Sequence, residues 1–204
     1  MTTILLVRHG EVAGINPPRF RGRDDLMLTP NGVRQAELAR DVITASWVPN
    51  AVYCSPLTRC VRTADSIAGS FQLDAQPHHG LNDINYGVWQ GMAVTEVAQR
   101  WPDELARWHS APHTMRPPGG ETLQEVQARA VDALQFIVHA HRHGIVVMVT
   151  HDSVIRVLLG HALGLPLSGY WTLAPSPCGI SEIVFADNRF TIRSINQTQH
   201  LSEA

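Results

Sequence analysis

Two histidines and two arginines in this sequence stand where they could act together on an anionic group. Arg8 and His9 directly follow one apolar run, His151 directly follows another, and Arg59 stands near the start of a predicted helix. A neutral imidazole is a nucleophile, and a guanidinium is a planar cation that grips phosphate or carboxylate oxygens. A histidine after a strand is often structural, so phosphoryl chemistry depends on whether these residues converge.

The elements before these residues predict that they do converge. Residues 4–7 and 145–149 are continuous apolar runs, typical of buried parallel strands. Ligands of open α/β sheets bind at the carboxyl ends of such strands, which share one edge. A short apolar run, 51–54, precedes Ser55-Pro56, which predicts a helix N-cap, a helix start near Leu57 and Arg59 in the first helical turn.

The remaining pattern predicts alternating strands and helices followed by a hairpin. Thr29-Pro30 predicts a helix start, and the Thr122–Glu125 capping box predicts a helix closed by Gly144. The other expected elements are a helix over 153–163, a β-hairpin of 180–186 and 190–195, and a frayed polar tail over 197–204. We therefore predict a three-layer α/β/α sandwich whose central sheet is mostly parallel with an antiparallel edge strand.

The length of 204 residues predicts one domain, 1–204, with a lid-like insertion. The segment from about 80 to 120 is irregular and rich in Pro, His and Gly around a helical stretch, 92–108, that Pro102 interrupts. Long irregular segments of this kind often cover a site, so we expect this one to border the substrate.

Composition excludes several classes of protein. Apolar residues make up 44% and charged residues 17%, as in soluble globular domains. A net charge of −2 without a long run of basic residues argues against a nucleic-acid partner. Three cysteines without a CxxC pair suit a reducing cytosol. No charged leader with an apolar core and no stretch of membrane-spanning length is visible, so we expect a cytoplasmic protein without a membrane partner. A homodimer is one oligomeric state that the sequence allows.

The clustered histidines and the tryptophans are explained more simply by structural roles than by metal binding or base stacking. His139, His141 and His143 alternate near a helix end, where a spacing of two directs side chains to different faces, so we predict no metal site there. The tryptophans are expected to pack rather than stack on bases.

Beyond these arguments, the motifs resemble the histidine phosphatase superfamily, the phosphoglycerate mutase-like enzymes. Val7–Glu11 is similar to the family signature. Further matches are 55–59 with 62–64, 81–83 with 87–91, 118–122, and 149–151 with 154–156. The motifs cover nearly the whole chain in the family's order.

The resemblance implies a mechanism without metal or cofactor. His9 would attack phosphorus and form a phosphohistidine that water hydrolyses, with its other ring N–H held by a backbone carbonyl. Arg8, Arg59 and His151 would stabilise charge on the phosphoryl oxygens. Asp83 stands at the position of the family's proton donor. Family members mostly carry Glu or Asp at this position, and Asp83 is one methylene shorter than Glu. Burial or a bound phosphate dianion would keep it protonated.

The resemblance also implies substrate contacts and two departures. Besides Arg8 and Arg59, it assigns phosphate or substrate binding to Asn16, Arg21, Gly22 and Tyr86. Family members often carry Asn six residues after the first histidine, where this chain has Ile15 followed by Asn16. Many carry Gly after the second histidine, where this chain has Asp152, which would either cap the next helix or stabilise a charged His151.

Three functions follow from the sequence, in order of preference. The first is a phosphomonoesterase acting on a small phosphorylated metabolite, with acidic substrates recruited by the arginines of 19–23. The second is a phosphoglycerate mutase, although mutases resembling this chain are longer and carry paired arginines where it has separated Arg100 and Arg107. The third is a catalytically silent phosphoester-binding protein, which the presence of all four pocket residues disfavours.

Overall fold

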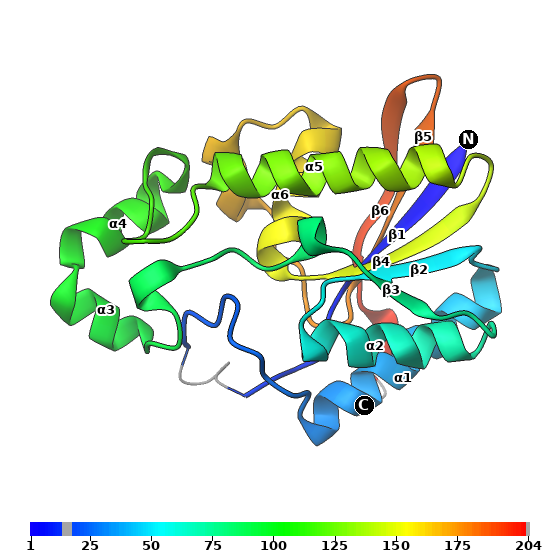
Figure 1. The fold of residues 1–204 in the computed structure, drawn as a ribbon, viewed down its shortest axis with the longest axis horizontal. Coiled ribbons are helices and arrows are strands. Elements are labelled where there is room, and N and C mark those ends of the chain that lie inside the picture. Colours follow the sequence, from blue (N-terminus) through cyan, green and yellow to red (C-terminus); the bar gives the residue numbers. More distant parts are fainter. Residues whose placement is uncertain (14–17, 203–204) are drawn as a thin grey trace.

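A six-stranded sheet forms the centre of the computed structural model, which describes residues 1–13 and 18–202 (Figure 1). The strand order is β3-β2-β4-β1-β5-β6, in which β1 to β4 are mutually parallel while β5 is antiparallel to both its neighbours. The strands are β1 (Thr2–Arg8), β2 (Ala51–Cys54), β3 (Ala75–Pro77), β4 (Ile145–Thr150), β5 (Ile180–Ala186) and β6 (Arg189–Gln197). The predicted fold class is confirmed; the sequence pattern missed only the short strand β3.

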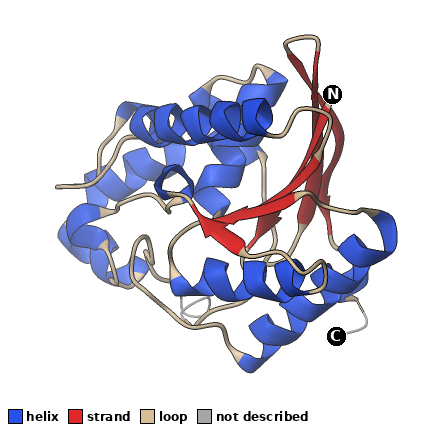
Figure 2. Cartoon of the chain, turned by 45° about the vertical axis from the view of Figure 1, so that its right-hand side comes forward, coloured by secondary structure: helices blue, strands red, loops and turns tan. Residues whose placement is uncertain are grey.

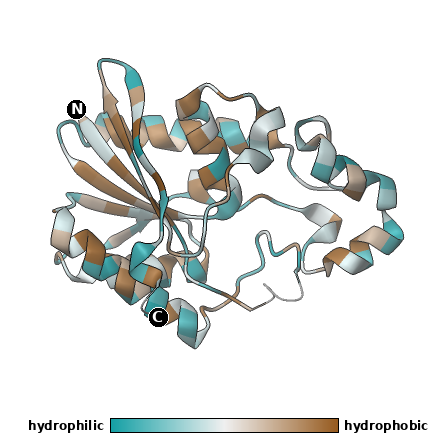
Figure 3. Ribbon diagram, turned by 180° about the vertical axis from the view of Figure 1, so that it is seen from behind, coloured by the Kyte–Doolittle hydropathy of each residue, from teal (hydrophilic) through white to brown (hydrophobic). Residues whose placement is uncertain are grey.

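Helices cover both faces of this sheet (Figure 2). Alternate residues of each central strand belong to two separate apolar cores: Leu5 and Val7 pack with α1 (Pro30–Ser46) and α2 (Thr58–Gly69), whereas Ile4 and Leu6 pack with α5 (Leu123–Ala140) and α6 (Asp152–Leu163). Figure 3 shows long hydrophobic stretches along the central strands. Both faces of the strands are buried, which explains their unbroken apolar runs.

Adjacent ends of β1 and β4 bring the two histidines together. Arg8 pairs with Thr150 in the parallel register, and His9 N–H donates to the Thr150 carbonyl over 2.9 Å. The chain leaves both strands at this point, so the His9 and His151 ring centroids lie 5.2 Å apart. The predicted convergence at the carboxyl edge of the sheet is confirmed.

The turn after His9 depends on a contact between two glycines. A Cβ atom on Gly10 would lie 2.3 Å from the Gly32 carbonyl oxygen, and one on Gly32 would lie 2.1 Å from the Glu11 carbonyl oxygen. Only residues without a side chain allow backbones to approach so closely. Gly10 and Gly32 therefore set the turn after His9 against the first turn of α1.

The start of α2 differs from its prediction. Leu57, not Ser55, is the N-cap residue, and no side chain of its own segment caps the helix. Instead Asp25 accepts hydrogen bonds from the Thr58 N–H and hydroxyl groups, both over 2.7 Å. A carboxylate from another segment satisfies the helix start, which leaves the Ser55 hydroxyl available for a different partner.

The segment between β3 and α5 extends to one side of the sheet (Figure 1). Its helices α3 (Val94–Arg100) and α4 (Pro102–Ser110) are separated at Pro102, as predicted, and short 3₁₀ turns η1 (His79–Leu81), η2 (Gly87–Trp89) and η3 (Pro112–Thr114) complete it. Trp89 and Trp108 are fully buried in it, so their predicted packing role is confirmed.

Two predictions, for the end of helix α5 and for the C-terminal segment, were wrong. Helix α5 ends at Ala140 rather than near Gly144, because its C-cap residue His141 already leaves the helical conformation, with a ψ angle of 51°. His143, in a left-handed conformation with φ +67°, then turns the chain toward β4. The segment 197–202 is ordered: β6 reaches Gln197, a 3₁₀ turn η5 (Gln199–Leu201) follows, and Leu201 packs on the core beside α1. Among the described residues, no helix combines the length and apolar character needed to cross a bilayer.

Candidate active site

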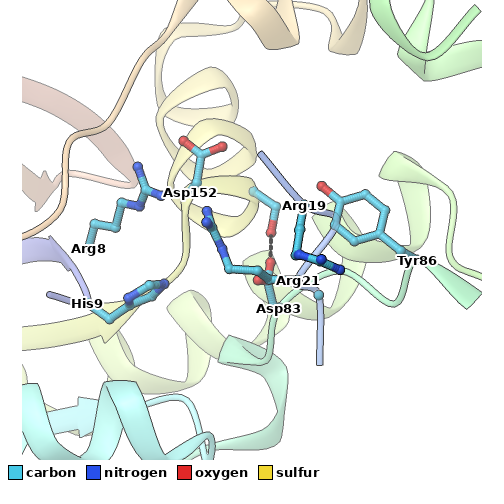
Figure 4. A pocket seen from close by; sticks show the side chains of 9 residues that line it. Arg8, His9, Arg19, Arg21, Asp83, Tyr86 and Asp152 are labelled. Carbon is cyan, nitrogen blue, oxygen red and sulfur yellow. Dashed lines mark hydrogen bonds between the residues drawn. The ribbon is translucent and has the colours of Figure 1, made fainter. Parts of the chain in front are cut away.

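A polar pocket opens at the carboxyl edge of the sheet, around the residues that the sequence analysis singled out (Figure 4). Its lining combines cations from the N-terminal loop with groups from the segment after β3 and the start of α6. The lining residues are Arg8, His9, Arg19, Arg21, Gly22, Asp83, Tyr86, Asp152 and Ser153. This composition favours an anionic ligand.

His9 is held as a neutral imidazole with a defined tautomer. Its Nδ1–H donates to the Gly10 carbonyl over 2.7 Å, as expected, so Nε2 carries the lone pair. That nitrogen accepts from Arg59 Nε over 3.2 Å. Burial, followed by the nearby His151 and Arg59, lowers the pKa of His9 well below its usual range. The side chain is therefore an uncharged imidazole at neutral pH, with its lone pair on Nε2.

Arg59 is completely buried and links the centre together. It donates to the backbone carbonyls of Gly22 over 2.7 Å and Asp24 over 2.6 Å. It also contacts Asp83 Oδ2 and His151 Nδ1, each over 3.2 Å. Its guanidinium thus lies behind His9 rather than among the groups that line the pocket.

His151 is also neutral and fully buried. Because its Nδ1 faces Arg59, its Nε2–H donates to the Ser55 hydroxyl over 2.7 Å. Burial and the Arg59 charge lower the pKa of His151 well below its usual range. Neither prediction for Asp152 holds: its side chain does not cap α6, and it forms an ion pair with Arg156 over 2.9 Å instead of supporting a charged His151.

The two lowered pKa values predict a loss of stability in mild acid. Below about pH 6.5 the unfolded chain protonates His9 and His151 while the folded chain does not, so the free energy of unfolding falls until the pH reaches the lowered folded pKa values. Each histidine steepens this slope by up to about 1.4 kcal/mol per pH unit, a limit that is reached when the unfolded imidazole is fully protonated. In urea titrations between about pH 6.5 and 5.5, His151→Gln should have a slope shallower by about 1 kcal/mol per pH unit.

Exposed His139 offers the matched control. The same titration of His139→Gln shows what a histidine-to-glutamine substitution does at an exposed position. Equal slopes for His151→Gln and the unsubstituted chain would contradict a neutral, buried His151.

Asp83 reaches the pocket despite its short side chain (Figure 4). Its Oδ1 accepts from the Ser153 hydroxyl over 2.6 Å and from the Ile84 N–H over 2.9 Å, while Oδ2 faces Arg59. Ser153 was not predicted as a site residue. Its place two residues after His151, in the first turn of α6, was the available signal.

A second arginine, which is partly buried, fixes the backbone that carries Asp83. Arg129 on α5 donates to the carbonyls of Gly80, Asn82 and Asp83 over 3.0, 2.6 and 3.0 Å. Its guanidinium also pairs with Glu121 over 3.0 Å. The position of Asp83 therefore follows from α5, which no local sequence signal indicated.

The predicted substrate contacts fall into three groups. Arg8, Arg21, Gly22 and Tyr86 line the pocket, Arg59 lies behind it, and Asn16 lies outside the described residues. Arg19 also lines the pocket and donates to the Gly91 carbonyl over 2.7 Å. Burial raises the pKa of Tyr86, so its phenol stays protonated.

The three alternating histidines meet different partners, although only His139 lies on the helix and the predicted helical spacing does not extend to His141 and His143. His139 Nδ1 donates to the Gln135 carbonyl, His141 Nε2 contacts the Tyr53 hydroxyl, and His143 Nδ1 contacts the N-terminal amine. Within residues 1–13 and 18–202, no three His, Cys, Asp or Glu side chains are grouped so as to hold a metal ion.

Comparisons with known proteins agree with this geometry. The family model "Histidine phosphatase superfamily (branch 1)" matches residues 4–198. The chain is 32% identical to "Phosphoserine phosphatase 1" of Hydrogenobacter thermophilus, covering 100% of this chain and 96% of that one. It is 30% identical to "Uncharacterized phosphatase PhoE" of Bacillus subtilis, covering 99% and 98%.

The solved structure of Bacillus stearothermophilus YhfR superposes with a TM-score of 0.94 at 28% identity, covering 98% of this chain and 100% of that one. Fold, motifs and relatives thus agree over nearly the whole length. The chain belongs to branch 1 of the histidine phosphatase superfamily and is one of its phosphomonoesterases.

Proposed function

We propose that this enzyme hydrolyses a small phosphorylated metabolite through a phosphohistidine at His9 and needs no metal ion. One observation carries the proposal: a buried neutral imidazole with a fixed tautomer opens onto a pocket lined by arginines. Such an imidazole can attack phosphorus directly, and the arginines supply the charge stabilisation that phosphoryl transfer requires.

In the first step His9 Nε2 bonds to phosphorus and the bond to the leaving oxygen breaks. Arg59 Nε, 3.2 Å from that nitrogen, is positioned to transfer its hydrogen bond to a phosphoryl oxygen as the new bond forms. Arg8 has a buried Nε–H without a hydrogen-bond partner among the described residues, which suits a second phosphoryl oxygen. Both hydrogen bonds gain strength as negative charge develops on the phosphoryl oxygens.

Asp83 donates the proton that the leaving alkoxide takes. A phosphate dianion beside the carboxylate favours its protonated form, because two negative charges in one site repel each other. In the second step Asp83 accepts a proton from water, which attacks the phosphohistidine and releases inorganic phosphate and His9. His151, kept neutral by burial, holds Arg59 in place through Nδ1.

The leaving group is small and acidic. Arg19 and Arg21 line the pocket outside the Arg8–His9 pair, and they suit a carboxylate on the same substrate. The segment 80–120 supplies Asp83 and Tyr86 to this side of the pocket, in keeping with a lid-like insertion. The phosphatase relatives favour transfer to water over return to substrate, so hydrolysis is preferred to a mutase reaction.

Phosphate release from a panel of monoesters tests this function. We expect turnover of p-nitrophenyl phosphate and faster turnover of at least one small phosphorylated acid, such as O-phosphoserine or 3-phosphoglycerate. Both rates should be unchanged by EDTA, since the proposed steps use only side chains. Loss of activity with EDTA, or isomerisation of 3-phosphoglycerate in the presence of 2,3-bisphosphoglycerate, would contradict the proposal.

A further inference from the structure

Asp152 supplies an acceptor group to a pocket whose other charged groups are mostly donors. It lines the pocket with Arg8, Arg19 and Arg21 at the start of α6 (Figure 4). Its Oδ1 atom is buried and has no hydrogen-bond partner among the described residues. A buried acceptor without a donor is costly, so a donor brought by a bound substrate would offset that cost.

The other Asp152 oxygen holds the side chain in place. Oδ2 accepts from Arg156 Nε over 2.9 Å. Arg156 is fixed in turn, since it donates to the carbonyls of Tyr170 and Leu173 and its guanidinium lies 5.3 and 5.1 Å from the ring centroids of Tyr170 and Trp171. The carboxylate is therefore fixed in position by the 170–173 segment.

Asp83, the other carboxylate of the pocket, cannot take this role. Both of its oxygens already accept hydrogen bonds from Ser153, Ile84 and Arg59. The arginines carry donors alone, and they meet the acceptor groups of the substrate. A hydrogen-bond donor on the substrate therefore has Asp152 Oδ1 as its matching pocket acceptor.

We propose that Asp152 determines specificity by accepting a hydrogen bond from an ammonium or hydroxyl group on the leaving group. This rests on the proposed phosphatase function and adds the kind of leaving group: a small acid that carries a donor beside its phosphate-bearing carbon. An ammonium binds more strongly than a hydroxyl, since both partners are charged. A leaving group without a donor leaves Oδ1 buried and unpaired, and the enzyme discriminates against it.

Three substrates that differ at one position test the proposal. O-phospho-L-serine has an ammonium at its second carbon, 3-phospho-L-glycerate has a hydroxyl there, and 3-phosphonooxypropanoate has neither. We expect kcat/KM to be about 10- to 100-fold higher for one or both donor-bearing substrates than for 3-phosphonooxypropanoate. Comparing kcat/KM for O-phospho-L-serine with that for 3-phospho-L-glycerate shows whether Asp152 prefers an ammonium or a hydroxyl donor. Equal kcat/KM for all three would overturn the proposal without any variant.

Asp152→Asn tests the residue itself. Its amide oxygen stays on Arg156, because an amide N–H would oppose the guanidinium, and its N–H then faces the donor of the substrate. The kcat/KM ratio of donor-bearing to donor-free substrate should fall about 10-fold or more. Asp41→Asn, at an exposed position on α1, is the matched control and should keep the ratio. An unchanged ratio in Asp152→Asn would overturn the proposal.

Failure of this proposal is distinguishable from failure of the proposed function. Turnover of p-nitrophenyl phosphate by the unsubstituted chain reports on the phosphatase reaction alone. If the unsubstituted chain hydrolyses p-nitrophenyl phosphate but Asp152→Asn keeps the kcat/KM ratio of donor-bearing to donor-free substrate, only the proposed role of Asp152 fails. If p-nitrophenyl phosphate is not hydrolysed, the proposed phosphatase function fails. The affinities of the three compounds for the unsubstituted chain and for Asp152→Asn, measured by calorimetry, then test Asp152: the preference for donor-bearing compounds should fall in the variant, and an unchanged preference would overturn its role.

Discussion

His9→Ala should lower kcat for p-nitrophenyl phosphate by about 10⁴-fold. The substitution removes the atom that bonds to phosphorus, and no other neutral imidazole nitrogen among the described residues lines the pocket, because His151 lies behind Arg59 with both ring nitrogens engaged. Steady-state phosphate release gives the rate. Rapid quenching into alkali, where phosphohistidine survives, should trap a labelled phosphoenzyme in the unsubstituted chain and none in the variant.

His139→Ala provides the control, because His139 is exposed and lies outside the pocket lining. It should retain the kcat of the unsubstituted chain and the same yield of phosphoenzyme. A His9→Ala protein with more than a tenth of the original kcat would mean that another group attacks phosphorus, and the phosphohistidine at His9 would have to be abandoned.

Arg59→Met should damage stability and activity together. Methionine fills much of the space but cannot donate to the Gly22 and Asp24 carbonyls, and it leaves the Asp83 carboxylate without its buried cation. Breaking a buried ion pair of this kind costs about 3–5 kcal/mol in the free energy of unfolding. The nucleophile also loses the donor on Nε2, so kcat should fall by about 10³-fold. Urea unfolding and steady-state kinetics measure the two effects.

Arg62→Met is the matched control, three residues further along α2 on an exposed face. It should change the free energy of unfolding by no more than about 0.5 kcal/mol. Arg59→Lys should lie between Arg59→Met and the unsubstituted chain, since an ammonium keeps the charge but cannot reach all the partners of a guanidinium. An Arg59→Met protein as stable as the Arg62→Met control would contradict the bridging role of Arg59.

The meeting of His9, Arg59 and His151 could be predicted because each residue follows a local signal. Continuous apolar runs identify parallel strands, parallel strands share an edge, and residues just beyond their ends converge. The hairpin turn at Asp187-Asn188 could be predicted for a similar reason, since both residues tolerate the positive φ angles, +50° and +58°, that they adopt.

Contacts between distant segments could not be predicted from the sequence. Ser55 matched a local helix cap, yet Asp25 caps that helix and the Ser55 hydroxyl serves His151. No local sequence signal distinguishes Arg129 from other residues of α5, but it fixes the backbone around Asp83. In each case the deciding hydrogen bond joins residues that only the folded chain brings together.

The contact between Gly10 and Gly32 has a consequence for the evolution and redesign of this enzyme. The imidazole of His9 is oriented through the Gly10 carbonyl, and Gly10 touches α1 through backbone atoms alone. At this contact neither residue has a side chain, so a substitution would push the two backbones apart instead of making a small adjustment. Two further contacts are made by side chains: Thr63 Oγ1 accepts from the Gly10 N–H over 3.2 Å, and Arg59 Nε donates to His9 Nε2. We therefore expect substitutions that adjust the surroundings of His9 to be tolerated around Arg59 and Thr63, and not at Gly10 or Gly32.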